Sequence, residues 1–261
     1  SNQKYEGAGT IEFIYDIDNK KFYFLEMNTR IQVEHPVTEA ITDFDLVAMQ
    51  IKFALKMNID SIDQNKINKS GHAIECRLYA EDPTKNFLPS PGKIKKLKIP
   101  NIGLTNIRLD IGVDEGDEIS FYYDPMIAKI ISKGVNRNES IKNMIHYLNN
   151  LEIEGINTNK DFLISVLQNK SFENASYNTK FIENNLSLFT KKITSIAKIR
   201  SEVLKSDKII QKYTDKDVKA FEKIVSKSPK DKTSQNYTEK DMKAFNNIVL
   251  KKVFLRLNIR S

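Results

Sequence analysis

The chain has 261 residues, 40% hydrophobic and 29% charged, an ordinary globular composition that suffices for one large domain or two smaller ones. No run approaches the ~18 uncharged apolar residues of a membrane-spanning helix, so we expect no membrane span and no membrane partner. The net charge of +7 comes from the tail. Residues 1–190 carry 22 basic and 26 acidic residues, whereas residues 191–261 carry 19 basic and 8 acidic residues. The net charge therefore does not predict nucleic-acid binding by residues 1–190.

The first predicted element is a β-hairpin. Two alternating apolar and polar runs, residues 10–15 and 21–26, flank a segment rich in turn residues. If the hairpin is symmetric about Asn19, Glu12 faces Glu26 directly. Side chains in directly opposed positions lie about 4.5–5.5 Å apart at Cβ, where like charges repel.

These facing carboxylates predict a bound cation. Asn28 follows Glu26 by two residues, on the same face of the strand, and adds an amide oxygen. Two carboxylates and an amide, here Glu12, Glu26 and Asn28, suit a hard cation such as Mg²⁺ or Mn²⁺ that holds phosphate oxygens. The alternative is a surface hairpin with two unrelated glutamates.

Residues 22–39, FYFLEMNTRIQVEHPVTE, are the most unusual stretch. From Glu26 to Glu34 the even positions hold two carboxylates, two amides and a guanidinium, and most odd positions are apolar. A straight strand would separate these two glutamates by roughly 26 Å, too far for one active site. We therefore expect the chain to bend between Asn28 and Gln32.

A helix is predicted to follow. Pro36 is expected to stop strand pairing, and Thr42 and Asp43 offer caps for the helix. Its apolar residues point to more than one side, so we expect it to be buried. They are Leu46, Val47, Met49, Ile51, Phe53, Ala54 and Leu55. The polar residues 58–70 are a candidate joint between two subdomains.

Residues 71–79 alternate again, with Ile74, Cys76 and Leu78 on one face and Glu75 and Arg77 on the other. Cys76 is therefore expected in the core. As the single cysteine it excludes an internal disulfide, and the chain begins with no basic-then-apolar leader. We expect a reducing compartment, with the cytoplasm as the default and a matrix-like compartment as the alternative if a targeting peptide was removed.

The next segments predict strands followed by helices, the pattern of an α+β domain. Residues 107–113 read as a half-buried strand, and residues 121–131 lead into a further strand. Apolar residues then recur at helical spacing, the second group behind a Thr158 or Asn159 cap. They are Ile141, Met144, Ile145 and Leu148, and then Phe162, Leu163, Val166 and Leu167.

The tail contains a tandem repeat with a period of 24 residues. Residues 213–225 and 237–249 each read as a Thr-capped amphipathic helix. Two such helices bury little apolar area, so we expect them to need a partner surface or to remain partly ordered. Their aromatic residues lie at helix-core spacing rather than among the lysines, which argues against nucleic-acid binding.

The order of residues in the hairpin carries a family resemblance. Glu12 and the run EMNTRIQVEHPVTE at residues 26–39 closely resemble the signature of biotin carboxylases, which are ATP-grasp ligases. These are subunits or domains of acetyl-, propionyl- and methylcrotonyl-CoA carboxylases and of pyruvate carboxylase. The resemblance runs from about Gly7 to about Leu186. Residues 107–113 and 121–129 are most similar to the α-chains of the propionyl- and methylcrotonyl-CoA enzymes.

The resemblance implies an α+β fold in three parts. Residues 1–56 would form the C-terminal end of an ATP-grasp domain, and residues 57–190 the biotin carboxylase C-terminal domain. Residues 191–261 would be a basic helical tail without a counterpart in the family. The implied reaction is ATP-dependent carboxylation of carrier-bound biotin by bicarbonate, with propionyl-CoA as the favoured final acceptor.

The resemblance also implies roles for single residues. Glu12, Glu26 and Asn28 would hold the Mg²⁺ or Mn²⁺ that bridges the ATP phosphates. Bicarbonate would be bound by Arg30, Gln32 and the backbone N–H of Val33. Arg30 can bind it through two N–H groups at once, which a lysine could not.

Two further residues would carry the proton chemistry. Glu34 matches the general base that deprotonates bicarbonate, and Arg77 matches the residue that stabilises the biotin enolate. Two nearby polar residues are expected to have structural roles instead. They are His35, through a hydrogen bond rather than catalysis, and Asp124, in a packing turn rather than as a partner of Arg77.

No glycine-rich flap or nucleotide-binding domain precedes Gly7, and the Met-Lys-Met motif of a biotin carrier is absent. We therefore expect partners: the N-terminal half of a biotin carboxylase, a biotin carboxyl carrier domain and a carboxyltransferase subunit. A homodimer is a further expectation, and the isolated chain is expected to be inactive. The alternative is a non-catalytic remnant that acts as a binding or dimerisation module.

Overall fold

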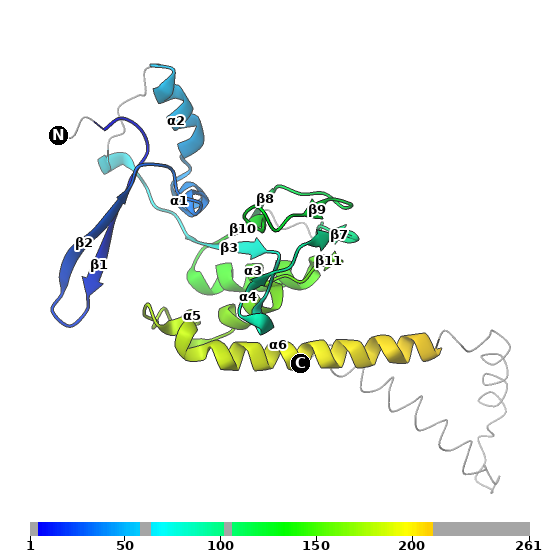
Figure 1. Cartoon of the computed structure of the whole chain (residues 1–261). Helices are drawn as coiled ribbons and strands as arrows, with labels where there is room; N and C mark the ends of the chain where they lie inside the picture. The colour runs from blue at the N-terminus through cyan, green and yellow to red at the C-terminus, as the bar shows by residue number, and fades with distance from the viewer. Residues whose placement is uncertain (1–4, 58–63, 102–105, 211–261) are drawn as a thin grey trace, which may run out of the picture. The chain divides into compact units, whose positions relative to one another are not determined.

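A computed structural model describes residues 5–57, 64–101 and 106–210 (Figure 1). The predicted tandem repeat and much of the predicted joint lie outside these residues. The chain divides into two compact units, residues 1–200 and 201–261. Over the described ranges, no helix combines the length and the apolar character needed to cross a membrane.

The predicted hairpin is present as β1 (Thr10–Asp16) and β2 (Lys21–Asn28), paired antiparallel (Figure 1). The predicted register is confirmed, because Glu12 pairs with Glu26, and a bulge follows between Glu12 and Phe13. The large apolar side chains of this two-stranded sheet are largely exposed. They are Ile11, Phe13, Ile14, Tyr15, Phe22, Tyr23, Phe24, Leu25 and Met27.

Helix α1 (His35–Thr42) was not predicted. Pro36 does more than stop the strand: it is buried in the first turn of α1, where its missing N–H costs no hydrogen bond. Thr42 and Asp43 end this helix instead of starting the next one. Asp43 adopts a left-handed conformation with φ of 58°, and its N–H donates to the carbonyl of Glu39 at 2.9 Å.

Helix α2 (Leu46–Ala54) is capped by Asp45, whose side chain accepts a hydrogen bond from the backbone N–H of Ala48 at 2.7 Å. The prediction of a buried helix was wrong, since no residue of α2 is buried. In the part of the chain that is described, the apolar sides of α2 remain open to solvent. The exposed apolar residues are Val47, Ile51 and Phe53.

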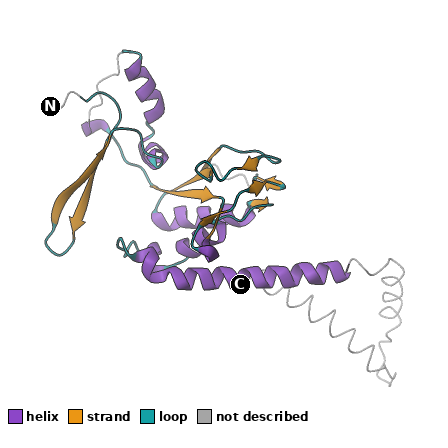
Figure 2. Ribbon diagram, viewed as in Figure 1, coloured by secondary structure: helices purple, strands orange, loops and turns teal. Residues whose placement is uncertain are grey.

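A three-stranded antiparallel sheet follows, in the order β3 (His72–Tyr79), β10 (Met126–Gly134), β8 (Ile107–Ile111). One face packs against α3 (Arg137–Asn150) and α4 (Lys160–Leu167). Strands followed by helices confirm the predicted α+β class (Figure 2).

The main core lies between this sheet and its two helices. Cys76 is 5% exposed, and burial raises the pKa of its thiol to about 12, which confirms it as a core residue. The helical spacing is confirmed by Ile141, Met144 and Leu148, all buried on α3.

Shorter elements complete the described chain. They are η1 (Gln64–Lys66), β4 (Glu81–Asp82), η2 (Pro83–Lys85), β5 (Leu88–Pro89), β6 (Gly92–Lys93), β7 (Lys96–Lys98), β9 (Glu118–Ile119), β11 (Glu152–Glu154), α5 (Lys170–Glu173) and α6 (Phe181–Ile210). A second apolar cluster joins Phe162 of α4 to Phe181, Phe189 and Ile193 of α6. Helix α6 runs through residues 190 and 191 without a break.

The opposite face of the three-stranded sheet is charged. Glu75 and Arg77 of β3 lie on it, and so do Lys129 of β10 and Arg108 and Asp110 of β8, because side chains alternate between the two faces. Lys129 is paired with Arg77 on one side and with Asp110 on the other. We call these five residues the charged face. It lies against the segment that contains α1.

Candidate functional site

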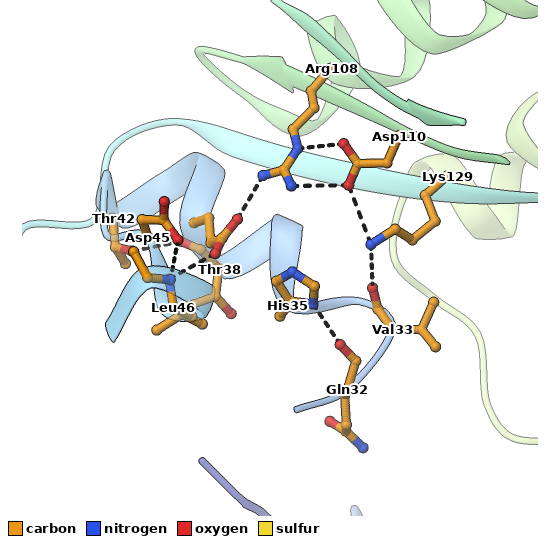
Figure 3. A network of polar contacts seen from close by, with 12 residues as sticks. Gln32, Val33, His35, Thr38, Thr42, Asp45, Leu46, Arg108, Asp110 and Lys129 are labelled. Atoms are coloured by element: carbon orange, nitrogen blue, oxygen red, sulfur yellow. Dashed lines mark hydrogen bonds and ion pairs between the residues drawn. The ribbon is translucent and has the colours of Figure 1, made fainter. Parts of the chain in front are cut away.

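Ionic contacts from the charged face hold the α1 segment (Figure 3). Arg108 donates to both oxygens of Asp110, at 2.8 and 2.9 Å, and to Glu39 of α1 at 2.6 Å. The other oxygen of Glu39 accepts a hydrogen bond from the backbone N–H of Leu46 at 2.7 Å. The hydrogen bonds that Arg108 donates to Asp110 and Glu39 raise the pKa of its guanidinium further, so it remains charged. Arg108 therefore anchors both helices that follow the hairpin.

Lys129 makes a second contact with this segment. Its ammonium lies 3.3 Å from Asp110 and 3.4 Å from the backbone carbonyl of Val33, which directly precedes Glu34 (Figure 3). Its side chain is only 16% exposed. Neither Lys129 nor Arg108 was among the predicted site residues. For Lys129 the available signal was a charged side chain within the apolar run of residues 126–131.

The predicted bend is confirmed. Strand β2 ends at Asn28, and the chain turns back so that the Gln32 amide donates to Glu12 of the hairpin at 2.5 Å. His35 Nδ1 lies 2.7 Å from the carbonyl of Gln32, which confirms the expected structural hydrogen bond (Figure 3). The bend brings Gln32 next to the predicted metal ligands.

The three predicted metal ligands are in contact with one another. The Asn28 amide nitrogen donates to Glu12 at 2.7 Å and to Glu26 at 3.0 Å. The Asn28 N–H groups between the two carboxylates offset the repulsion that the sequence predicts for Glu12 and Glu26. Rotating the amide by 180° would present its oxygen instead. This donor set, all oxygen after that rotation, fits Mg²⁺ or Mn²⁺.

We expect Asn28→Ala to destabilise the metal-free chain by about 1 kcal/mol, because it removes the donor shared by two carboxylates. Urea unfolding in the presence of a chelator measures the effect. Asn138→Ala, at an exposed position of α3, is the control. Equal stability of the two variants would show that the amide does not hold the carboxylates together.

Arg77 and Glu34 form an ion pair although they come from different parts of the chain. Arg77 Nη2 lies 2.5 Å from Glu34 Oε2, and their side chains are 40% and 49% exposed. The backbone carbonyl of Arg77 accepts a hydrogen bond from Asn159 at 3.1 Å. Asn159 occupies the N-cap position of α4, as predicted, although its side chain makes no capping hydrogen bond. It binds β3 instead and fixes the strand that carries Arg77.

Arg30, Gln32 and Glu34 line one hollow of about 720 Å³, together with residues of α1 and α2. A guanidinium, an amide and a carboxylate beside an open hollow can bind a small oxyanion and accept a proton from it. Asp124 accepts a hydrogen bond from the backbone N–H of Met126 at 2.8 Å, which confirms its predicted role in a packing turn.

Glu75 was not predicted as a functional residue. Its side chain is 4% exposed, and neither of its carboxylate oxygens has a hydrogen-bond partner among the described residues. Burial raises the pKa of Glu75 to about 7. The sequence placed it on the polar face of its strand, but its burial depends on what packs there.

Comparisons with known proteins match most of the described chain. Residues 75–184 match the family described as "Biotin carboxylase C-terminal domain", and residues 1–62 match "Carbamoyl-phosphate synthase L chain, ATP binding domain". The chain is 49% identical to Biotin carboxylase 1 of Bacillus subtilis over 179 residues, which are 69% of this chain and 39% of the relative. It is 48% identical to the mitochondrial propionyl-CoA carboxylase alpha chain of Sus scrofa over 181 residues, which are 69% of this chain and 24% of the relative.

Solved structures agree with these matches. The biotin carboxylase subunit of a pyruvate carboxylase is 42% identical, with a TM-score of 0.66 over 70% of this chain and 40% of that one. The biotin carboxylase domain dimer of Hydrogenobacter thermophilus 2-oxoglutarate carboxylase, in complex with MgADP, ADP and bicarbonate, is 40% identical, with the same score and coverage. The chain thus spans about two fifths or less of the length of these proteins.

Proposed function

We propose that the chain is part of a biotin carboxylase, a ligase that carboxylates carrier-bound biotin with bicarbonate at the expense of ATP; the matched family models, relatives and solved structures support this. The observation that carries this proposal is the ion pair between Arg77 and Glu34, beside a hollow lined by Arg30 and Gln32. Residues 1–56 would serve as the end of an ATP-grasp domain, residues 57–190 as the C-terminal domain, and residues 191–261 as an additional tail.

Glu12, Glu26 and Asn28 would hold Mg²⁺, or Mn²⁺ with the same oxygen ligands. Bound there with ATP, the cation would neutralise charge on the phosphates during phosphoryl transfer. Two observations support this assignment: the mutual contacts of the three side chains, and the MgADP bound to the Hydrogenobacter thermophilus domain. The Gln32 amide, 2.5 Å from Glu12, would link this metal site to the bicarbonate site.

The bicarbonate site would consist of Arg30, Gln32 and the backbone N–H of Val33. Glu34 would accept the bicarbonate proton as general base, and Arg77 would stabilise the negative charge of the biotin enolate. The contact of Lys129 with the Val33 carbonyl would fix the backbone between the bicarbonate ligands and Glu34. For Glu34 to act as a base, its ion pair with Arg77 must loosen when substrate enters.

The proposed partners are the remaining portion of a biotin carboxylase, a biotin carrier domain, a carboxyltransferase subunit and a second copy in a homodimer. The exposed apolar hairpin supports a covering partner, because an extended apolar surface is typical of an interface. The amino-acid sequence of residues 107–113 and 121–129 supports a propionyl-CoA type of enzyme. The single cysteine supports a cytoplasmic location.

The test is a reconstituted complex: the full 261-residue chain mixed with the remaining portion of Bacillus subtilis Biotin carboxylase 1. We expect ATP hydrolysis that depends on bicarbonate and biotin from the complex, and none from the chain alone. Phosphate release measures both. A complex that forms on a sizing column but shows no turnover would favour the non-catalytic binding module, and turnover by the chain alone would contradict the need for a partner.

A further inference from the structure

Glu75 is a buried carboxyl without a hydrogen-bond partner in the described part of the chain. It precedes Arg77 by two residues on the charged face, and its side chain is 4% exposed. A polar group buried without a hydrogen bond is unfavourable, and a buried charge is more so. Packing alone would be served better by an apolar residue, so Glu75 calls for a functional explanation.

Charged groups surround Glu75 from every element on this face. Arg77 lies on its own strand, and Lys129 lies on β10. Arg108 and Asp110 lie on β8. The segment that packs on this face contributes Glu34 and, on α1, Glu39, which pairs with Arg108. Burial raises the pKa of Glu75 to about 7; Lys129 and Arg77 oppose this rise, whereas Glu34 and Asp110 add to it. The charge of this carboxyl therefore changes close to neutral pH.

Arg77 lies between two carboxyl groups that can compete for it. Its Nη2 contacts Glu34 Oε2 at 2.5 Å, whereas its Nε lies 3.9 Å from Glu75 Oε1, too far for a hydrogen bond. A shift of about 1 Å would bring the Nε–H within the 2.7–2.9 Å of a charge-assisted hydrogen bond. Arg77 is thus hydrogen-bonded to the half-exposed Glu34, whereas its contact with the buried Glu75 is a longer ion pair without a hydrogen bond.

We propose that Glu75 is a positioning residue for Arg77: it accepts the Nε–H when the guanidinium moves away from Glu34. This inference rests on the proposed function. The shift releases the Glu34 carboxylate to act as a base. The shift also keeps the Nη N–H groups of Arg77 directed at substrate, because the hydrogen bond from Nε–H to Glu75 fixes the plane of the guanidinium. Lys129, on the neighbouring strand, helps to stabilise the ionised Glu75.

The proposal predicts a pH dependence. Below about pH 7 Glu75 is protonated and attracts Arg77 weakly, so the guanidinium stays on Glu34. Above that pH the carboxylate attracts Arg77, and turnover should rise. In the reconstituted complex we expect Glu75→Gln to lower kcat by about tenfold and to leave the KM for ATP unchanged. The rise of kcat near pH 7 in the pH profile, the limb due to Glu75, should be absent.

Two further variants sharpen this kinetic test. Glu75→Asp keeps the charge and should restore the limb, while Glu118→Gln removes an exposed carboxylate on β9 and should leave the profile unchanged. A Glu75→Gln enzyme with the kcat and the pH profile of the wild type would overturn the proposal.

A second measurement does not need activity. In the ¹³C-Glu-labelled 261-residue chain, the carboxyl signal that Glu75→Gln removes should titrate near pH 7 and should move to higher pH in Arg77→Met. If it does so while the reconstituted complex is inactive, the coupling of Glu75 to Arg77 stands and the proposed function fails. If the complex is active but the signal titrates near 4.5, the role of Glu75 fails alone.

Discussion

Glu75→Gln is expected to stabilise the 261-residue chain at pH 8. The pKa of Glu75 lies at about 7 in the folded protein against an ordinary value of 4.5, so the folded state binds the proton more tightly than the unfolded state. Wild-type stability should therefore fall as the pH rises from about 4.5 to about 7, and the whole penalty, about 3 kcal/mol, should persist above that range. Glutamine has no proton to lose, so it escapes the penalty.

Urea unfolding of both proteins at pH 4, 6 and 8 measures this effect. The two stabilities should be close at pH 4, where Glu75 is protonated in both states, and should diverge as the pH rises. Glu118→Gln, at an exposed position of β9, serves as the control and should follow the wild type at each pH. A variant that is no more stable than the wild type at pH 8 would contradict the raised pKa of Glu75, because that pKa already includes the attraction of Lys129 and Arg77.

Glu34→Gln should cause the largest loss of turnover. The amide can still accept a hydrogen bond from Arg77, so the local structure is preserved, but it cannot take a proton from bicarbonate. Loss of a general base lowers the rate by about 10²–10⁴-fold, and we expect kcat of the reconstituted complex to fall by that factor. The KM for ATP should change little, because Glu34 is outside the three proposed metal ligands.

Bicarbonate-dependent ATP hydrolysis measures the Glu34 effect, with Glu118→Gln again as the control. Circular dichroism of the Glu34→Gln chain should match the wild type, which separates lost chemistry from lost structure. Retention of more than a tenth of the wild-type kcat would assign the proton transfer to another group. The pH profile of the residual activity would then help to identify that group.

Local sequence features predicted the hairpin and its register. The turn residues between two alternating runs leave little choice of pairing, so Glu12 and Glu26 could be placed opposite each other in advance. The bend after Asn28 followed from distance alone. The same reasoning could not orient the Asn28 amide, because that depends on which of its two ends finds a partner in the folded chain.

Long-range contacts were beyond the reach of the sequence. Arg108 and Glu39 are 69 residues apart, and no periodicity in either segment indicates that they meet. Asn159 is the N-cap of α4, a position that Asn favours, but the sequence did not show that its side chain bonds to β3 rather than to the helix. Helix α1 was missed because Pro36 was read as a strand terminator, although proline fits the first turn of a helix equally well.

By itself the sequence determined the α+β class, the alternating faces of β1, β3 and β8, and the residue types that point to the metal and oxyanion sites. These properties are local, since they depend on the period of two in a strand and on the chemistry of each side chain. Only the tertiary structure decided that Arg77 meets Glu34 and that Glu75 is buried beside them without a hydrogen bond. The physical reason is that burial and charge pairing depend on which distant segment covers a strand face. Here the segment that contains α1 packs on the charged face.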